Sequence, residues 1–130
     1  LNAKNIADYF KSQQRKVDIN TIYNYLNALD SAFVIQRIPR YDIKGKEILQ
    51  TNEKYFVSDL SLIYSVMGYR DRLIGGMLEN LVCMELKRRG YEVYVGKQDE
   101  KEVDFVAIRR EDENICAGYL STWLASNHRL

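Results

Sequence analysis

The stretch YEVYVGKQDEKEVDFVAI, residues 91–108, decides the fold of the second half of the chain. Its two ends, 91–95 and 102–108, are rich in valine and aromatic residues, which predicts two strands. The polar segment 96–100 between them begins with a glycine and is typical of a turn. We therefore expect a β-hairpin over this stretch.

A helix is predicted directly before this hairpin, over 71–89. Apolar residues recur along one side of it at helical spacing: Leu73, Met77, Leu81, Met84 and Leu86. Its end is marked by three cations and Gly90, since cations complement the carbonyl end of a helix and glycine adopts the left-handed turn. A shorter helix, capped by Asp59 or Ser61 and ended by Gly68, precedes it. Helices followed by strands predict an α/β unit.

The first half of the chain shows a different order of elements. Two short helices, over 3–12 and about 20–30, flank the polar segment SQQRK at 12–16, which predicts a helix-turn-helix. The second helix would be capped by Asp18 or Asn20 and bury Ile22, Tyr25, Leu26 and Leu29. A strand over 33–38 ended by Pro39, a turn at Gly45, and strands at 47–49 and 54–57 follow. This order is typical of a winged helix.

Composition excludes several classes of protein. The 130 residues carry 19 Lys and Arg against 18 Asp and Glu, a net charge of +1, which argues against a disordered chain or a strongly basic coat protein. No apolar run approaches the ~20 residues of a membrane span, so no membrane partner is expected. Two cysteines are too few for a disulfide framework and favour a cytoplasmic location. Because the chain begins with Leu1, we expect it to be a piece of a longer protein.

Four stretches resemble a known family: ENLV at 79–82 with ELKRRGYEVY at 85–94, KEVDFV at 101–106, IPRYDIKGK at 38–46 and TNEKYFVSDL at 51–60. They are similar to the uncharacterised C-terminal domain that follows the ATPase core in a large group of bacterial and archaeal AAA-type ATPases. The resemblance covers about residues 1–112. No Gly-x-x-x-x-Gly-Lys-Ser/Thr loop occurs, so the ATPase core itself is absent.

The last region of that family is similar to the PD-(D/E)XK nuclease fold. The resemblance therefore implies an α+β protein with two units. A winged-helix-like unit would occupy 1–57, and a truncated restriction-endonuclease-like α/β unit would occupy 58–130. The segment 113–130 is an atypical tail that does not look like the family. The third strand of the nuclease-like unit is therefore missing, and the edge that it leaves predicts exposed backbone groups near residues 101–108.

Nuclease chemistry of this type needs clustered carboxylates, because Mg²⁺ takes oxygen ligands and bridges the scissile phosphate to an attacking water. The resemblance makes Glu79 and Glu85 the candidate helix carboxylates and Asp104 the strand carboxylate, with Glu79 and Asp104 as candidate Mg²⁺ ligands. By strand alternation Glu102 would share the face of Asp104. No Lys follows Asp104, so the catalytic set is incomplete and we expect this chain not to catalyse cleavage.

Two groups of residues are candidates for contacting DNA. The outer side of the second helix could meet base edges, and the wing could hold phosphates. The candidates are Asn20, Tyr23, Asn24 and Asn27 on the helix and Arg37, Arg40, Lys44 and Lys46 on the wing. Winged helices behind ATPase cores also serve as lids or packing modules, and that alternative stays open. Several tyrosines, Tyr9, Tyr25, Tyr55 and Tyr64, fall on apolar stripes and predict core packing more than base stacking.

The leading hypothesis is thus a non-catalytic accessory module of an AAA-type ATPase that engages nucleic acid, a protein partner or the ATPase core. One alternative is a Mg²⁺-dependent nuclease that obtains its remaining ligands from a lost segment or a second copy. The other is a module that binds only protein.

Overall fold

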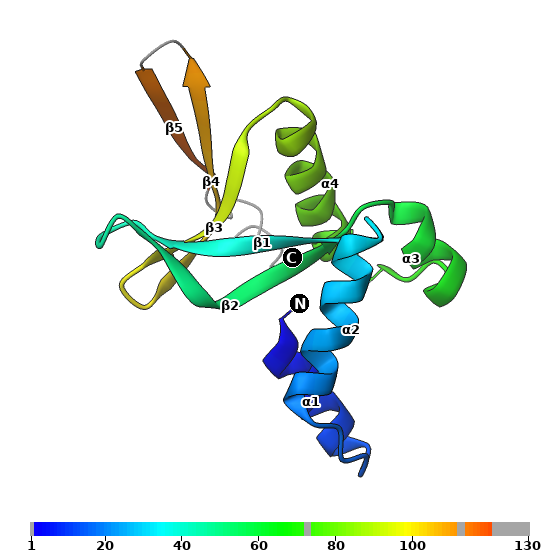
Figure 1. The fold of residues 1–130 in the computed structure, drawn as a ribbon. Coiled ribbons are helices and arrows are strands. Elements are labelled where there is room, and N and C mark those ends of the chain that lie inside the picture. Colours follow the sequence, from blue (N-terminus) through cyan, green and yellow to red (C-terminus); the bar gives the residue numbers. More distant parts are fainter. Residues whose placement is uncertain (1, 72–73, 112–113, 121–130) are drawn as a thin grey trace, which may run out of the picture.

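Five strands form one mixed sheet in the order β2-β1-β3-β4-β5, and four helices pack around it (Figure 1). This computed structural model describes residues 2–71, 74–111 and 114–120. The elements are α1 (Ala3–Ser12), α2 (Ile19–Ser31), β1 (Ile35–Asp42), β2 (Glu47–Val57), α3 (Leu60–Met67), α4 (Ile74–Arg88), β3 (Glu92–Gln98), β4 (Lys101–Glu111) and β5 (Asn114–Leu120). The α+β class expected from the sequence is confirmed.

The helix ends follow local chemistry. The Asn2 side chain caps α1 by accepting a hydrogen bond from the Asn5 backbone N–H at 2.8 Å. The Asp59 side chain caps α3 in the same way, and Gly68, with φ of +67°, follows its last turn. Asp18 precedes α2 as predicted but makes no capping hydrogen bond through its side chain. These boundaries lie close to those expected from the sequence.

The hairpin of β1 and β2 corrects two expectations. Pro39 does not end the first strand, which continues to Asp42, and the two short strands expected after the turn are one strand, β2. Ile38 pairs with Lys54 and Arg40 with Leu49, so residues 50–53 of β2 bulge opposite Pro39 alone. Proline has no N–H to give to the ladder, and a bulge is therefore tolerated at this position.

The sheet crosses the boundary expected at residue 57. β1 pairs in parallel with β3, from Arg40 opposite Val95 to Asp42 opposite Lys97, so the expected wing belongs to the same sheet as the second half. The separate winged-helix and nuclease-like units stay predictions.

The strand β5 pairs with part of β4 along the edge that faces away from β3. Because the nuclease-like unit lacked a recognisable third strand, we expected exposed backbone groups over 101–108. That expectation is wrong for 106–108, which pair with β5 on one side and β3 on the other, and Phe105 pairs with β5 as well. The tail thus contributes a strand, and its remainder, 121–130, lies outside the described residues.

Helices cover opposite faces of the β1–β2 hairpin. Tyr55 and Ile35 pack with Ile22 and Leu26 of α2, whereas Phe56, the next residue of β2, packs with Cys83 of α4. Successive side chains of a strand point to opposite faces, so α1 and α2 lie on one face and α4 lies on the other. The α4 face holds the core of the second half, which includes Val95 and Phe105.

The buried side of α4 matches the apolar spacing only in part. Asn80 and Cys83 are its buried residues, with Met84 and Leu86 packed beside them, while Leu81 is 53% exposed. A second apolar stripe, made of Ile74, Leu78, Leu81 and Val82, is exposed. A helix with apolar residues on two sides gives an ambiguous pattern, and only packing decides which side is buried. Leu73 lies outside the described residues.

Gly96 allows β3 and β4 to approach closely. A Cβ atom at this position would lie 2.8 Å from the Val103 Cβ and 3.0 Å from the Val106 Cγ2. We expect Gly96→Ala to lower the free energy of unfolding by about 1–2 kcal/mol, because the packed sheet must shift to admit the methyl group. Gly76→Ala is the matched control: nothing lies within 4 Å, and alanine favours the helix. Chemical denaturation of both variants checks the contrast, and equal effects would contradict it.

Candidate functional site

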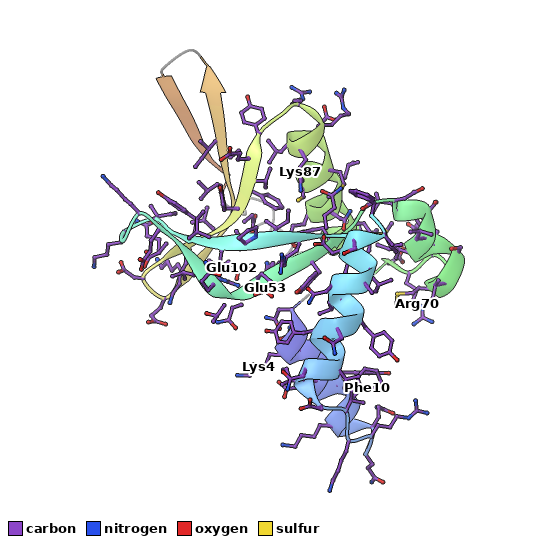
Figure 2. The ribbon with its side chains drawn as sticks, in the orientation of Figure 1. Lys4, Phe10, Glu53, Arg70, Lys87 and Glu102 are labelled. Atoms are coloured by element: carbon purple, nitrogen blue, oxygen red, sulfur yellow. The ribbon has the colours of Figure 1, made fainter. Side chains whose placement is uncertain are left out.

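A cluster of four charged side chains lies on the α4 face of the sheet. The Lys54 ammonium group of β2 contacts two carboxylates, Glu79 Oε1 of α4 at 3.2 Å and Glu102 Oε1 of β4. The Lys54 side chain is 17% exposed, and the two carboxylates are more open to solvent. Glu102 lies close to the β1–β2 hairpin (Figure 2). We call Arg40, Lys54, Glu79 and Glu102 the charge cluster.

Arg40 holds Glu102 from the other side. Its Nη1 lies 2.9 Å from Glu102 Oε2, and its Nε donates to the Asn52 carbonyl oxygen at 3.1 Å. Asn52 has a φ of +61° and belongs to the bulge opposite Pro39. The bulge therefore turns a backbone carbonyl toward Arg40, and two of the nitrogen atoms of its guanidinium group are paired inside the protein.

Strand register explains why these residues meet. Lys54 lies on the same face as Phe56 because the two are separated by one residue of β2, and that face packs against α4. Lys54 pairs with Ile38, two residues before Arg40 in β1, so both cations face α4. The sheet order then brings β4 and its Glu102 within reach across β3.

The ion pairs shift the titration of both principal partners. Burial alone would lower the pKa of Lys54, but the hydrogen bond to Glu102 and the charges of Glu79 and Glu102 outweigh it and raise that pKa above 10.5. Burial alone would raise the pKa of Glu102, but Lys54 and Arg40 outweigh it and lower that pKa below 4.5. Lys54 and Glu102 are thus both charged throughout the neutral range.

The structure brings together two of the four predicted carboxylates. Glu79 and Glu102 are joined through Lys54, whereas Glu85 accepts hydrogen bonds from Arg88 at 2.7 and 2.8 Å and from Arg89 at 2.7 Å. The bonds from Arg88 and Arg89 lower the pKa of Glu85 to about 2. Glu85 thus pairs with the cations at the C-terminal end of α4 and is not part of the charge cluster.

Asp104 is half-buried in a bulged part of β4. Tyr94 pairs with Val106 and Gly96 with Val103, so residues 104 and 105 stand opposite Val95 alone. A bulge interrupts the alternation on which the shared face of Glu102 and Asp104 was predicted. No group of three or more His, Cys, Asp or Glu side chains suited to a metal ion occurs within the part of the chain that the structure describes.

The predicted wing cations divide into paired and exposed side chains. Arg40 is held by Glu102 and Asn52, and Lys44 lies 3.1 Å from Asp99 in an exposed ion pair. Arg37 and Lys46 are exposed. The Arg40 side chain is 13% exposed and already paired with Glu102, and its contact with a phosphate stays a prediction.

The outer side of α2 largely matches the prediction. Asn20, Asn24 and Asn27 are exposed, but Tyr23 packs against the core of the first half. Tyr25, expected in that core, is 69% exposed. The packed side of α2 is thus rotated from Tyr25 toward Tyr23. Tyr9 and Tyr64 are exposed as well, so of the four tyrosines expected in the core only Tyr55 is buried.

Asn80 is the residue that the sequence analysis missed. It is buried on α4, where its side-chain oxygen accepts from the Val57 N–H at 2.8 Å and its amide donates to the Val57 carbonyl oxygen at 2.7 Å. Because β2 is an edge strand, this amide takes the place of a neighbouring peptide group. The signal available in the sequence was a polar residue on a predicted helix with apolar residues three and four positions away, Met77, Cys83 and Met84.

No helix among the described residues is long and apolar enough to cross a membrane. No solved structure matches the chain significantly. Two curated proteins do, both uncharacterised. One, from Haemophilus influenzae, is 42% identical over 113 residues, which are 87% of this chain and 28% of that protein. The other, from Methanocaldococcus jannaschii, is 31% identical over 123 residues, 92% of this chain and 27% of that protein.

The chain thus spans less than a third of the length of these relatives. Residues 1–73, from α1 to beyond α3, match a family described as a domain of unknown function, DUF8612. That match covers more than half of the 130 residues. The protein therefore belongs to the DUF8612 family.

Proposed function

We propose that this chain is a non-catalytic accessory module of an AAA-type ATPase and that it engages nucleic acid. The non-catalytic part of this proposal rests on the charge cluster. Lys54 forms ion pairs with Glu79, a candidate Mg²⁺ ligand, and with Glu102, the other candidate carboxylate that the structure brings beside it. A Mg²⁺ ion at this position would have to displace a paired ammonium group and would meet a second cation, Arg40.

Exposed apolar side chains support an accessory role. Val66, Met67 and Tyr69, in and after α3, are exposed, and α3 has no buried residue. The stripe on α4 that includes Leu78 and Leu81 is exposed too. Large exposed apolar side chains are typical of surfaces that pack against another domain or protein. Relatives more than three times as long as this chain offer such a domain.

One observation favours the nuclease alternative. The sequence has no Lys after Asp104, yet Lys54 reaches Glu79 and Glu102 from a strand that precedes them in the chain. A lysine beside two carboxylates is part of the catalytic set that the resemblance to PD-(D/E)XK nucleases implies. The same geometry therefore supports two functions, and a cleavage assay separates them.

We expect no cleavage when the protein is incubated with supercoiled plasmid and millimolar MgCl₂ or MnCl₂, because the carboxylates stay paired with Lys54 and Arg40. Gel electrophoresis of nicked and linear products measures this. Cleavage that is lost in Asp104→Ala and in Lys54→Met, but retained in the control variant Asp99→Ala, would overturn the non-catalytic proposal and establish the nuclease.

A further inference from the structure

The turn between α1 and α2 carries three cations at the end of the helical hairpin farthest from the sheet (Figure 1). Lys11, Arg15 and Lys16 line a hollow of about 420 Å³ there, together with Gln14 and Val17. We call residues 11–17 the α1–α2 tip. All three cationic side chains are exposed, and none forms an ion pair with a carboxylate of the described residues, in contrast to Arg40 and Lys44 of the hairpin.

The backbone of the tip is fixed by hydrogen bonds. The Arg15 N–H donates to the Phe10 carbonyl oxygen at 3.0 Å, and the Gln14 N–H donates to the Lys11 carbonyl oxygen at 3.1 Å. Gln14 has a φ of +57°, so the two bonds form the left-handed motif that ends many helices. The tip therefore presents its cations from an ordered turn, which lowers the entropic cost of binding a partner.

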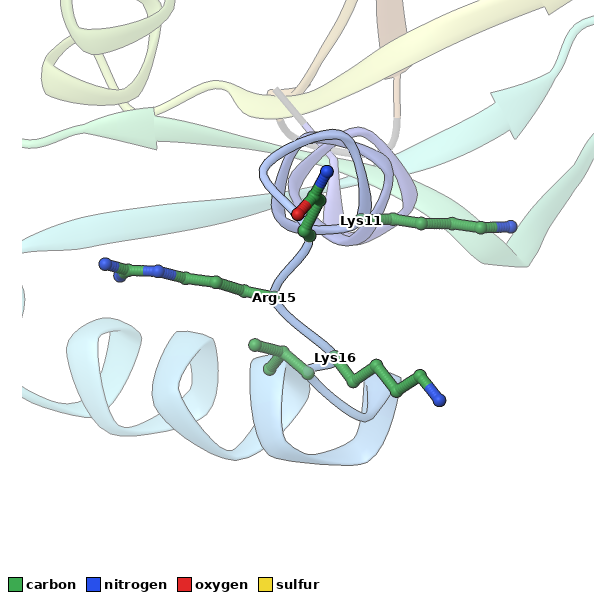
Figure 3. Close-up of a pocket in the computed structure, with 5 residues that line it drawn as sticks. Lys11, Arg15 and Lys16 are labelled. Carbon is green, nitrogen blue, oxygen red and sulfur yellow. The ribbon is translucent and has the colours of Figure 1, made fainter.

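The cations do not converge on one point. In the close-up of the hollow, Lys11 and Lys16 extend to one side of the turn and Arg15 extends to the other (Figure 3). A single phosphate or sulfate ion would be held by converging donors. Cations spread around a protruding turn suit a partner whose negative charges are also spread, such as a phosphodiester backbone.

The helix that follows the tip favours nucleic acid over an acidic protein. Asn20, Asn24 and Asn27 are spaced by four and three residues, so they share one exposed side of α2. Their amides both donate and accept hydrogen bonds and therefore match base edges better than they match carboxylates. An acidic protein surface would need further cations on this side of α2, which has none.

We propose that the α1–α2 tip, rather than the β1–β2 turn, is the phosphate-binding part of a nucleic-acid surface that continues along α2. This inference rests on the proposed engagement of nucleic acid and names the place of contact. Three phosphate contacts would give the affinity for duplex DNA a salt slope near −2.7, which is roughly a 40-fold loss between 50 and 200 mM salt.

Fluorescence anisotropy with a labelled 20-base-pair duplex and a labelled oligothymidine tests the inference. The tip variant is Lys11→Gln/Arg15→Gln/Lys16→Gln. Its control is Lys44→Gln/Lys46→Gln/Lys101→Gln. This variant also removes three positive charges, but from exposed positions in or next to the turns of the sheet. We expect the tip variant to bind duplex at least ten-fold more weakly than wild type at 50 mM salt with a flattened salt slope. The control variant should stay within about three-fold of wild type.

Other outcomes overturn the inference in distinguishable ways. Equal losses in the two variants would show that net charge, not the tip, determines binding, and engagement of nucleic acid would stand. Absence of binding by the wild-type chain at low salt would reject nucleic acid as the partner. The non-catalytic role would be unaffected by this result, because the cleavage assay tests it separately. Binding of polyglutamate as tight as that of DNA at the same salt would show an acidic-protein surface instead.

Discussion

Asn80→Ala should lower the free energy of unfolding by about 3 kcal/mol, because it leaves the Val57 N–H and carbonyl oxygen without partners at a partly buried position. For a chain of this size, that loss corresponds to a fall in melting temperature of roughly 10 °C. The side chain joins α4 to the end of β2, across the boundary expected at residue 57. Its loss should therefore destabilise the contact between the two halves of the chain.

Thermal and urea denaturation followed by circular dichroism measure the effect. Asn24→Ala is the matched control, since Asn24 is exposed on a helix and alanine is the better helix former. We expect that control to be neutral or slightly stabilising. An Asn80→Ala variant within about 0.5 kcal/mol of wild type would contradict the bridging role, because surface changes typically have effects of that size.

Lys54→Met should lower the free energy of unfolding by about 2–3 kcal/mol. This effect is smaller than that of removing one partner from a fully buried ion pair, because Glu79 and Glu102 retain some contact with water. The substitution keeps the length of the side chain as far as Cε, replaces the Cδ methylene by sulfur and removes the ammonium group. Glu79 then loses its cation, whereas Glu102 keeps Arg40. Replacing Glu79 by Gln in the same chain should restore part of the loss, which a double-mutant cycle measures.

The effect of Lys54→Met should depend on pH. The pKa of Glu102 is lowered, so its contribution is present above about pH 4.5 and is lost as the pH falls through its folded-state value. The pKa of Lys54 is raised, so its contribution is present below about pH 10.5 and is lost as the pH rises through its folded-state value. Wild type and Lys54→Met should therefore differ most between these limits.

Urea denaturation at several pH values tests this window. Lys44→Met is the control, because Lys44 and Asp99 form an exposed ion pair, and such pairs contribute about 0–1 kcal/mol. A pH-independent difference between wild type and Lys54→Met would show that packing of the side chain, rather than its charge, stabilises the fold.

Much of the secondary structure could be predicted from local pattern. The helix over 3–12 and the turn at Gly45 could be predicted because the spacing of apolar residues and the conformational freedom of glycine act over a few positions. The continuous strand β2 could not be predicted, because its bulge at 50–53 interrupts the alternation that marks a strand. Tyr25 was misplaced because two sides of α2 carry large apolar or aromatic groups, and the choice between them depends on what packs there.

The candidate site was predicted only in part. Glu79 follows from a resemblance that considers residues from the helix onward, and Glu102 follows from strand alternation beside Asp104. Lys54 precedes both residues in the chain and lies 25 residues before Glu79. Nothing in the sequence around Lys54 indicates that it pairs with a carboxylate. Arg40 was assigned to a phosphate because its segment is basic, whereas the structure turns it toward Glu102, 62 residues away.

The α+β class, the positions of most helix ends and the β-hairpins follow from local sequence, since periodicity, capping and turn residues act over short distances. The pairing of β1 with β3, the bridge from Asn80 to Val57, and the ion pairs of Lys54 and Arg40 with the candidate carboxylates depend on the folded chain as a whole. These contacts join residues far apart in the chain, and their partners are selected by sheet order and packing of the whole fold.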